Sequence, residues 1–183
     1  MSTASIPRLL TVADYEALPN RAGGHWELHH GEAVFVTFPK RLHKSLQRHI
    51  RRLLEDMCEP LGYVVDTEYP YKALPEHEVW GADVAVVHDT RDNAINDWLD
   101  GSPELVIEVR SRSNTKAALH DKAMTTLAGE GAVEFWVVDP KTASVTVYNK
   151  RRGMQIYAGD QMVPLPIAGG AHLRASDIVK AGK

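Results

Sequence analysis

Two acidic residues stand inside stretches of the chain that are otherwise apolar. Asp83 opens the run DVAVV, and Glu108 lies within the run LVIEV. Taking an ionised carboxylate out of water costs several kcal/mol unless it meets a cation or hydrogen-bond donors, so an acid in such a place has a specific partner. For either acid alone, an arginine or a set of backbone N–H groups is an equally good partner.

The two acids together point to a metal ion. If the two apolar runs form neighbouring strands, the side chains of Asp83 and Glu108 converge. Their oxygens then suit a hard divalent cation such as Mg²⁺, which prefers oxygen ligands and usually keeps several waters. The sequence therefore predicts a metal-binding site that is built on two adjacent strands.

Basic residues near Glu108 add to this pattern. Arg110 shares a strand face with Glu108, because side chains alternate along a strand, and Val109 points to the other face. An arginine keeps its charge at all ordinary pH values, so Arg110 suits a phosphate contact better than proton transfer. Lys122, on the helix expected after this strand, is the better candidate for activating a water molecule; the alternative is a solvated helix lysine.

A run of positive charge precedes both acids. Between residues 40 and 52 the sequence has six basic residues and no acid: Lys40, Arg41, Lys44, Arg48, Arg51 and Arg52. This run is able to bind phosphates, and such binding weakens steeply with salt. A solvated helix face explains the run equally well, because three acids follow it directly at Glu55, Asp56 and Glu59.

Nine histidines raise the question of a transition-metal site. The sequence contains no His-Glu-x-x-His motif, and no helical pair of histidines four residues apart has a third ligand nearby. His25, His29, His30 and His43 are therefore expected to have structural or surface roles.

The elements that must position these residues follow from the spacing of the apolar positions. Helices are expected over residues 11–18, over residues 42–57, and from residue 114 or 115 to residue 129 or 131. A hairpin is expected over residues 25–38, with its turn near His30 and Gly31. Further strands are expected at residues 62–74, 82–89, 104–111, 133–140, 144–150 and 153–159, and the tail at 171–179 suggests a short strand and a helical cap.

This order of elements predicts one domain over residues 1–183, of the α/β or α+β class, with a mixed central sheet flanked by helices and an N-terminal hairpin. The chain is 44% hydrophobic and 25% charged, which is typical of a globular protein. Its lone Cys58 allows no internal disulfide and favours a reducing cytoplasm. No apolar run approaches the length of a membrane span, and the net charge of −3 argues against a general nucleic-acid-binding module.

Several segments, in the right order, resemble the Uma-two family of restriction endonucleases, a branch of the PD-(D/E)XK nuclease superfamily. The resemblance runs from the first helix to about Tyr148. Its motifs are HWELHHGEAV, with Glu27 and Glu32 as the two family acids; His43 before the basic helix; GADVAVV, with Asp83; PELVIEVRSRS, with Glu108; Lys122; and GAVEFWVVDP. The chain departs from the family pattern at Ala82, where proline is usual, and at Thr126, where an aromatic residue is usual; both read as packing changes.

The resemblance implies a restriction-endonuclease-like fold and a Mg²⁺-dependent endonuclease that hydrolyses phosphodiester bonds in DNA, with Mn²⁺ as a substitute ion. Asp83, Glu108 and the carbonyl of Val109 are then the metal ligands, and Lys122 orients the attacking oxygen. Of the two hairpin acids, Glu32 is the preferred additional catalytic residue because of its place beside the turn at Gly31.

The expected partners are DNA, bound through Lys40, Arg41, Lys44, Arg48 and Arg110, and a second copy of the chain, since a homodimer offers one site to each DNA strand. Two alternatives stay open. One is a nuclease-fold protein without catalysis that serves as a nucleic-acid-binding or partner-binding accessory. The other is a metal-dependent hydrolase of a small phosphate ester.

Overall fold

A seven-stranded mixed sheet forms the centre of the computed structural model, which describes residues 8–93, 97–111 and 114–180. The strand order is β5-β3-β4-β6-β7-β8-β9. The strands are β3 (Tyr63–Lys72), β4 (Trp80–His88), β5 (Leu99–Asp100), β6 (Leu105–Val109), β7 (Glu134–Asp139), β8 (Ser144–Asn149) and β9 (Gly153–Ala158).

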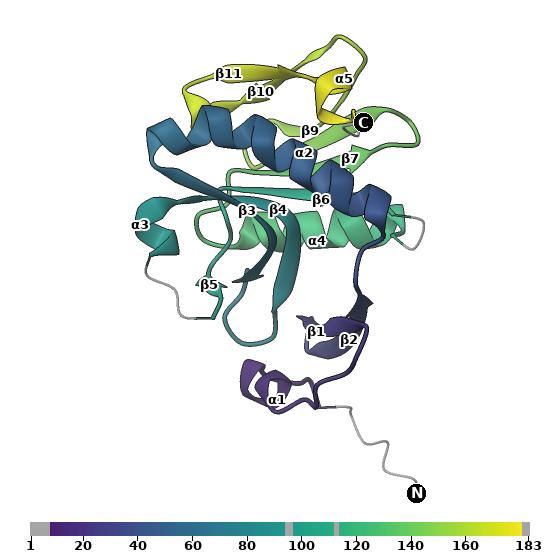
Figure 1. Ribbon diagram of the computed structural model, residues 1–183. Helices are drawn as coiled ribbons and strands as arrows, with labels where there is room; N and C mark the ends of the chain where they lie inside the picture. The colour runs from purple at the N-terminus through teal and green to yellow at the C-terminus, as the bar shows by residue number, and fades with distance from the viewer. Residues whose placement is uncertain (1–7, 94–96, 112–113, 181–183) are drawn as a thin grey trace, which may run out of the picture.

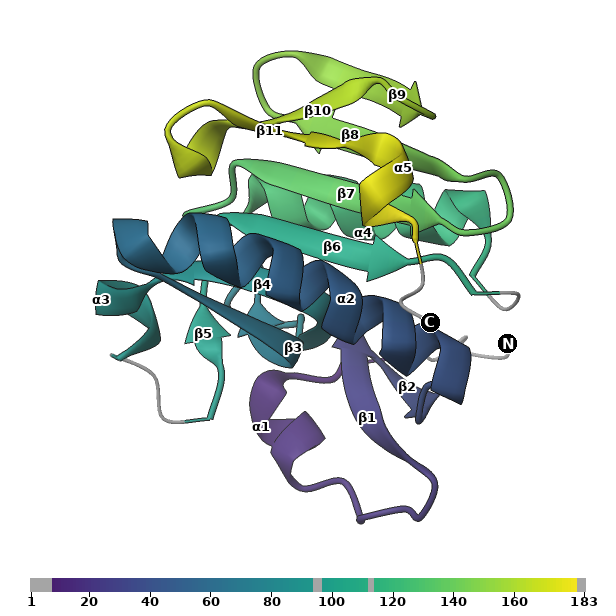
Figure 2. The same ribbon diagram turned by 45° about the horizontal axis from the view of Figure 1, so that its top comes forward.

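Two long helices cover the two faces of this sheet. Figures 1 and 2 show α2 (Arg41–Cys58) across one face and α4 (Lys116–Ala128) across the other. Figure 1 also shows the hairpin of β1 (Gly24–His29) and β2 (Glu32–Thr37) below one end of α2, with α1 (Val12–Glu16) beneath the hairpin.

Smaller elements complete the described chain. A second two-stranded sheet pairs β10 (Met162–Leu165) with β11 (Ala171–Arg174), and α5 (Ala175–Ile178) follows it. The remaining short helices are α3 (Asp89–Asp92) and two 3₁₀ turns, η1 (Glu59–Leu61) and η2 (Pro166–Ala168). No helix in the described part of the chain is both long enough and apolar enough to cross a bilayer.

The packing of α2 follows from its sequence. Leu46, Ile50, Leu54 and Cys58 recur every four residues, so their side chains form one stripe, and all four are buried against the sheet. On the opposite face, Leu119, Ala123 and Leu127 of α4 pack in a second apolar cluster. The sheet is therefore enclosed by two cores, and polar side chains within it must find partners.

The central strands bring together the two acids that the sequence singles out. β4 and β6 are antiparallel neighbours, and their last paired residues at one end are Val84 and Ile107. Asp83 and Glu108 come next on the two strands, beyond that pair. β6 and β7 are parallel, which requires a crossover connection, and α4 supplies it. The helix that carries Lys122 thus starts just after the strand that carries Glu108.

The pairing of β3 with β4 is interrupted beside Asp83. Thr67 pairs with Val84 and Tyr69 pairs with Ala82, but the intervening Glu68 has a positive φ of 54°. A positive φ is uncommon for a residue other than glycine, and it tilts the side chain out of the regular pleat. The irregularity lies next to the place where β4 parts from β6.

The expected elements are confirmed, with the differences at short segments. Thr11 caps α1 as expected, but the helix ends at Glu16, and Thr115 rather than Asn114 caps α4. Between the expected strands at residues 82–89 and 104–111 the chain contains α3 and β5, and neither these two elements nor β10 was expected. Residues 94–96, between α3 and β5, and residues 112 and 113, between β6 and α4, lie outside the described residues.

Candidate active site

Asp83 and Glu108 meet where β4 and β6 part. The backbone N–H of Asp83 donates to Oε1 of Glu108 at 3.4 Å, and the backbone N–H of Val109 donates to Oδ2 of Asp83 at 2.6 Å. Each acid thus contacts the other strand's end. The side chain of Glu108 is buried, with 7% of its surface exposed, whereas Asp83 retains 16%. The pair therefore lies within the sheet, and the carboxylate of Asp83 is the more exposed of the two.

The other oxygen of Asp83 is held by α2. Nε2 of His43 lies 2.8 Å from Oδ1 of Asp83, and the amide of Gln47 donates to the same oxygen at 2.8 Å. Residues four apart lie on the same face of a helix, so one turn of α2 presents both groups. Burial lowers the pKa of His43, but its contact with Asp83 outweighs burial, and the net pKa is raised.

Glu108 forms a buried ion pair with Lys122. Nζ of Lys122 lies 2.9 Å from Oε1 of Glu108 and donates to the carbonyl of Gly81 at 2.7 Å. Burial raises the pKa of Glu108, and nearby Asp83 adds to this, while Lys122 opposes it. Burial lowers the pKa of Lys122, but the carboxylates of Glu108 and Glu27 outweigh it, so the net pKa is raised and the ammonium stays charged.

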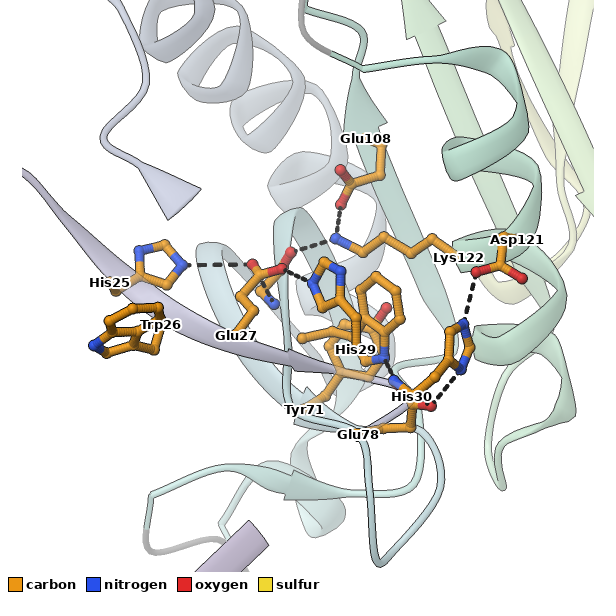
Figure 3. Close-up of polar contacts among 12 residues, drawn as sticks. His25, Trp26, Glu27, His29, His30, Tyr71, Glu78, Glu108, Asp121 and Lys122 are labelled. Atoms are coloured by element: carbon orange, nitrogen blue, oxygen red, sulfur yellow. Dashed lines mark hydrogen bonds and ion pairs between the residues drawn. The ribbon is translucent and has the colours of Figure 1, made fainter. Parts of the chain in front are cut away.

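Glu27 is the third acid of this cluster. Its Oε1 accepts from the N–H of Gly81 at 3.0 Å, and its Oε2 lies 2.6 Å from Nε2 of His29. Burial raises the pKa of Glu27, yet Lys122 and two flanking histidines, His25 and His29, hold it well below its usual range. Figure 3 shows Lys122 extending toward Glu108, with Glu27 beside it.

The charges of this cluster suit a divalent cation. Three carboxylates, on Glu27, Asp83 and Glu108, surround the ammonium of Lys122, and histidines contact two of them: His25 and His29 contact Glu27, and His43 contacts Asp83. In the described residues no group of three or more His, Cys, Asp or Glu side chains is arranged as a metal-binding cluster. Magnesium, however, is usually held by one or two carboxylates together with water, and Asp83, Glu108 and a backbone carbonyl match that donor set.

The predicted site residues divide into two groups. The structure brings Asp83, Glu108, Val109 and Lys122 together. It places Glu32 apart from them: Glu32 is exposed at the first position of β2, whereas Glu27, in the middle of β1, is buried against the cluster. The preference for Glu32 over Glu27 thus finds no support in the geometry.

The predicted DNA-binding residues also divide. Lys40, Arg41, Lys44 and Arg48 are exposed at the beginning of α2. Arg110 instead forms an ion pair with Asp139 at the end of β7, with Nη1 2.6 Å from Oδ2. Its guanidinium is therefore committed to a carboxylate in this structure and is not a free phosphate ligand.

Two contributors to the site were missed in the sequence. Gln47 is buried on α2 and joins Asp83 to Glu68, whose Oε1 accepts from the same amide at 2.6 Å. Gly81 joins Glu27 to Lys122 through its backbone, because its N–H donates to Glu27 and its carbonyl accepts from Lys122. A signal existed for Gln47, because it lies four residues after His43, and a buried polar residue on an apolar helix stripe needs a partner.

Comparison with known proteins supports a nuclease fold. The model of the Uma2 (Uma-two) family, described as "Putative restriction endonuclease", matches residues 12–176. A crystal structure described as "a putative nuclease belonging to DUF820" from Anabaena variabilis superimposes with a TM-score of 0.79 and 18% identity, covering 93% of this chain and 97% of that chain. A comparison with curated proteins found no match.

Proposed function

The chain belongs to the Uma2 family, and from that premise we propose that it is a metal-dependent endonuclease that hydrolyses phosphodiester bonds in DNA. One observation carries the proposal. Asp83, Glu108 and Lys122 come from three separate elements and meet at the point where β4 and β6 part, with Nζ of Lys122 2.9 Å from Glu108. Clusters of buried ionisable residues with perturbed pKa values are typical of functional sites, which supports a catalytic role for these residues.

The residues take distinct roles in this proposal. Asp83, Glu108 and the carbonyl of Val109 hold the divalent ion, Mg²⁺ or Mn²⁺. When bound, such an ion polarises the scissile phosphate and lowers the pKa of a coordinated water. His43 and Gln47 fix the orientation of the Asp83 carboxylate, so they are positioning residues.

Lys122 supplies hydrogen-bond donors and charge. Its ammonium has three N–H groups, of which one points to Glu108 and one to the Gly81 carbonyl. In this proposal the third N–H donates to an oxygen of the phosphate or to the attacking water. Because the pKa of Lys122 is raised, the ammonium orients that oxygen and stabilises negative charge, and it does not act as the proton acceptor.

The exposed basic residues of α2 give the DNA a place to bind. Lys44 and Arg48 each follow directly on a residue that holds Asp83, namely His43 and Gln47. A phosphate backbone bound along this end of α2 therefore passes close to the acids. We further expect a homodimer, in which two such sites address the two strands.

The test is cleavage of supercoiled plasmid in Mg²⁺ and in Mn²⁺. Wild-type protein is expected to nick and linearise the plasmid, and Glu108→Gln, which keeps the shape of the side chain, is expected to lose at least about a hundredfold in rate. Glu130→Gln, an exposed acid just after α4, is the matched control and should cleave like the wild type. Equal rates for Glu108→Gln and wild type would contradict the proposal.

A second candidate function has an observation in its favour. Asp83 already accepts hydrogen bonds from Val109 and Gln47 and contacts His43, so its oxygens are satisfied by the protein itself. This suits a nuclease-fold accessory protein that binds DNA without cutting it. Such a protein would bind DNA in a salt-sensitive manner, and Asp83→Asn and Glu108→Gln would leave that binding unchanged while no variant cleaved.

A further inference from the structure

An aromatic pocket borders the candidate active site. It has a volume of about 370 Å³, and its walls come from α1, β1, the start of α2 with the segment before it, β3 and β4. Its aromatic lining consists of Tyr15, Trp26, Phe38 and Trp80. This volume lies within the range of small-molecule sites, roughly 300–1,000 Å³, so one planar ring system with its sugar has room there.

The polar edges of three of these rings are already satisfied by the protein. The hydroxyl of Tyr15 donates to the carbonyl of Trp26 at 3.0 Å, and the indole N–H of Trp26 donates to the carbonyl of Pro19 at 3.0 Å. The indole N–H of Trp80 donates to Glu78 at 2.6 Å. Trp80 is 4% exposed and its ring already stacks on that of His29, with 3.8 Å between the centroids, so the rings left to stack against another flat ring are those of Tyr15, Trp26 and Phe38.

The pocket touches the active-site cluster on two sides. Glu27 and Gly81 line it, and the carbonyl of Gly81 binds Nζ of Lys122 at 2.7 Å. Glu68 also lines it, and the amide of Gln47 links Glu68 to Asp83. A ligand in the pocket would thus contact residues that are linked to Asp83 through Gln47 and to Glu108 through Lys122. In the view of Figure 3, His25 and Trp26 lie on one side of Glu27 and Lys122 on the other.

The rim of the pocket combines positive charge with an exposed ring. Phe38 is 58% exposed, and Nζ of Lys44, which also lines the pocket, lies 5.9 Å from the centre of its ring. An exposed aromatic ring beside a lysine is the pairing that binds single-stranded nucleic acid, because the ring stacks on a base and the ammonium attracts the adjoining phosphate.

We propose that this aromatic pocket binds one unstacked nucleobase of the DNA substrate, next to the phosphate at the Asp83–Glu108 site. The inference rests on the proposed function and narrows its substrate class to DNA with an unpaired or extruded base. A base inside a duplex must be unstacked before it can enter, and the free-energy cost of unstacking is smallest where the base is already unpaired. Stacking on an aromatic side chain offsets that cost.

The experiment measures DNA binding without cleavage, by fluorescence anisotropy, with the Glu108→Gln protein in a buffer that lacks divalent ions. Three duplexes of one sequence are compared: a fully paired one, one with a single bulged base, and one with an abasic residue in place of the bulged base. The bulged duplex is expected to bind about tenfold more tightly than the other two, because only it presents a free base for stacking.

A second substitution assigns the preference to the pocket. Phe38→Ala removes a ring that is already 58% exposed, so the fold should tolerate it, and the preference for the bulged base should fall to about twofold or less. Ile156→Ala, which is 60% exposed on β9 at the far edge of the sheet, is the matched control and should keep the full preference.

Two results would overturn the inference: equal affinity for the bulged and abasic duplexes, or an unchanged preference in Phe38→Ala. The plasmid assay separates this failure from failure of the proposed function. If the wild type cleaves DNA but shows no base preference, only the proposed binding of a base in the pocket is contradicted. If the protein shows the base preference but never cleaves DNA, only the proposed nuclease activity is contradicted.

Discussion

Lys122 shows at the scale of a single residue why an acid interrupts the apolar strand β6. Glu108 is buried, and its charge is matched by an ammonium that reaches it from the helix on the same face of the sheet. Such a pair adds little net stability, but removal of one partner leaves a buried charge unpaired. The pair is therefore better understood as part of a site than as a device for stability.

Lys122→Met is expected to destabilise the protein by about 3–5 kcal/mol and to abolish cleavage, because Glu108 and the Gly81 carbonyl lose their shared donor. Urea unfolding measures the stability. The double variant Glu108→Gln with Lys122→Met should be more stable than Lys122→Met alone, since Glu108 no longer carries a buried charge that has lost its partner. Strictly additive losses in the double variant would show that the two side chains do not form a pair.

His30 is expected to make the attachment of the hairpin depend on pH. Its Nδ1 lies 2.7 Å from Glu78 and its Nε2 2.6 Å from Asp121 of α4. The contact with Asp121, aided by Glu78 and opposed by burial, raises the pKa of His30. A raised histidine pKa stabilises the fold fully below its unfolded pKa of about 6.5, and that stabilisation is lost as the pH rises through the folded pKa.

The thermal midpoints of the wild type and His30→Asn should therefore differ most below the unfolded pKa of about 6.5 and converge as the pH rises through the folded pKa of His30. Asparagine is chosen because residue 30 has a φ of 50°, a conformation that asparagine tolerates. A difference that stays constant across this pH range would show that the imidazolium is not what holds the hairpin.

At the scale of the elements, the sequence predicts α2, α4 and the central strands well: α2 repeats its apolar residues with a helical period, α4 lies between the cap residue Thr115 and Gly129, and β6 and β7 are continuous apolar runs. The short β5, β10 and α3 were missed, since two to four residues show no period and depend on neighbours for their hydrogen bonds. The proximity of Asp83 to Glu108 was predictable once β4 and β6 were taken as neighbours, and the pairing of the two strands confirms that they are.

The choice between the two hairpin acids was not predictable. Glu27 and Glu32 both flank the turn, and their depths depend on how the hairpin packs against β4 through the bridge between Leu28 and Val79. No local pattern encodes that packing. The same holds for Gly81, which contributes only its peptide, and for Arg110, whose partner Asp139 lies on a strand that is distant in sequence.

The connection between α4 and β7 supplies a prediction at this scale. Gly131 has a φ of 89°, and an added Cβ would lie 2.0 Å from Nη1 of Arg91, which is also paired with Glu104, and 2.6 Å from the backbone carbonyl oxygen of Ser102, which is less free to move than a side chain. Gly153, with a φ of 71°, has open space around it. Both alanine variants carry the left-handed backbone penalty of about 1–2 kcal/mol, but Gly131→Ala should cost about 1–3 kcal/mol more through overpacking.

Chemical denaturation of the two glycine variants measures this difference. Gly153→Ala serves as the control for backbone strain alone. If both variants lose the same stability, the contact of Gly131 with Arg91 does not constrain this connection.

At the scale of the whole molecule, positive charge is local and net charge is negative. The chain carries −3 overall, yet exposed basic residues gather at the start of α2, beside the candidate site. DNA is therefore expected to bind by this end of α2. A phosphate contact made by one basic side chain changes the slope of log affinity against log salt by about 0.9.

Arg48→Gln should accordingly reduce the salt slope of DNA binding by about 0.9. Arg151→Gln, an exposed basic residue in the turn between β8 and β9, is the matched control and should leave the slope unchanged. Fluorescence anisotropy with one duplex over a range of salt concentrations gives both slopes. Equal slopes for the wild type, Arg48→Gln and Arg151→Gln would show that Arg48 makes no phosphate contact and that DNA binds to another surface.

Binding of a divalent cation by the intact protein is the most direct measurement of whether Asp83 and Glu108 form a metal site. Calorimetric titration with Mn²⁺ should show saturable binding to the wild type and to Glu130→Gln, and at least about tenfold weaker binding to Asp83→Asn, which retains the shape but not the charge of the ligand. Wild-type affinity in Asp83→Asn would contradict a metal centre at this pair of strands.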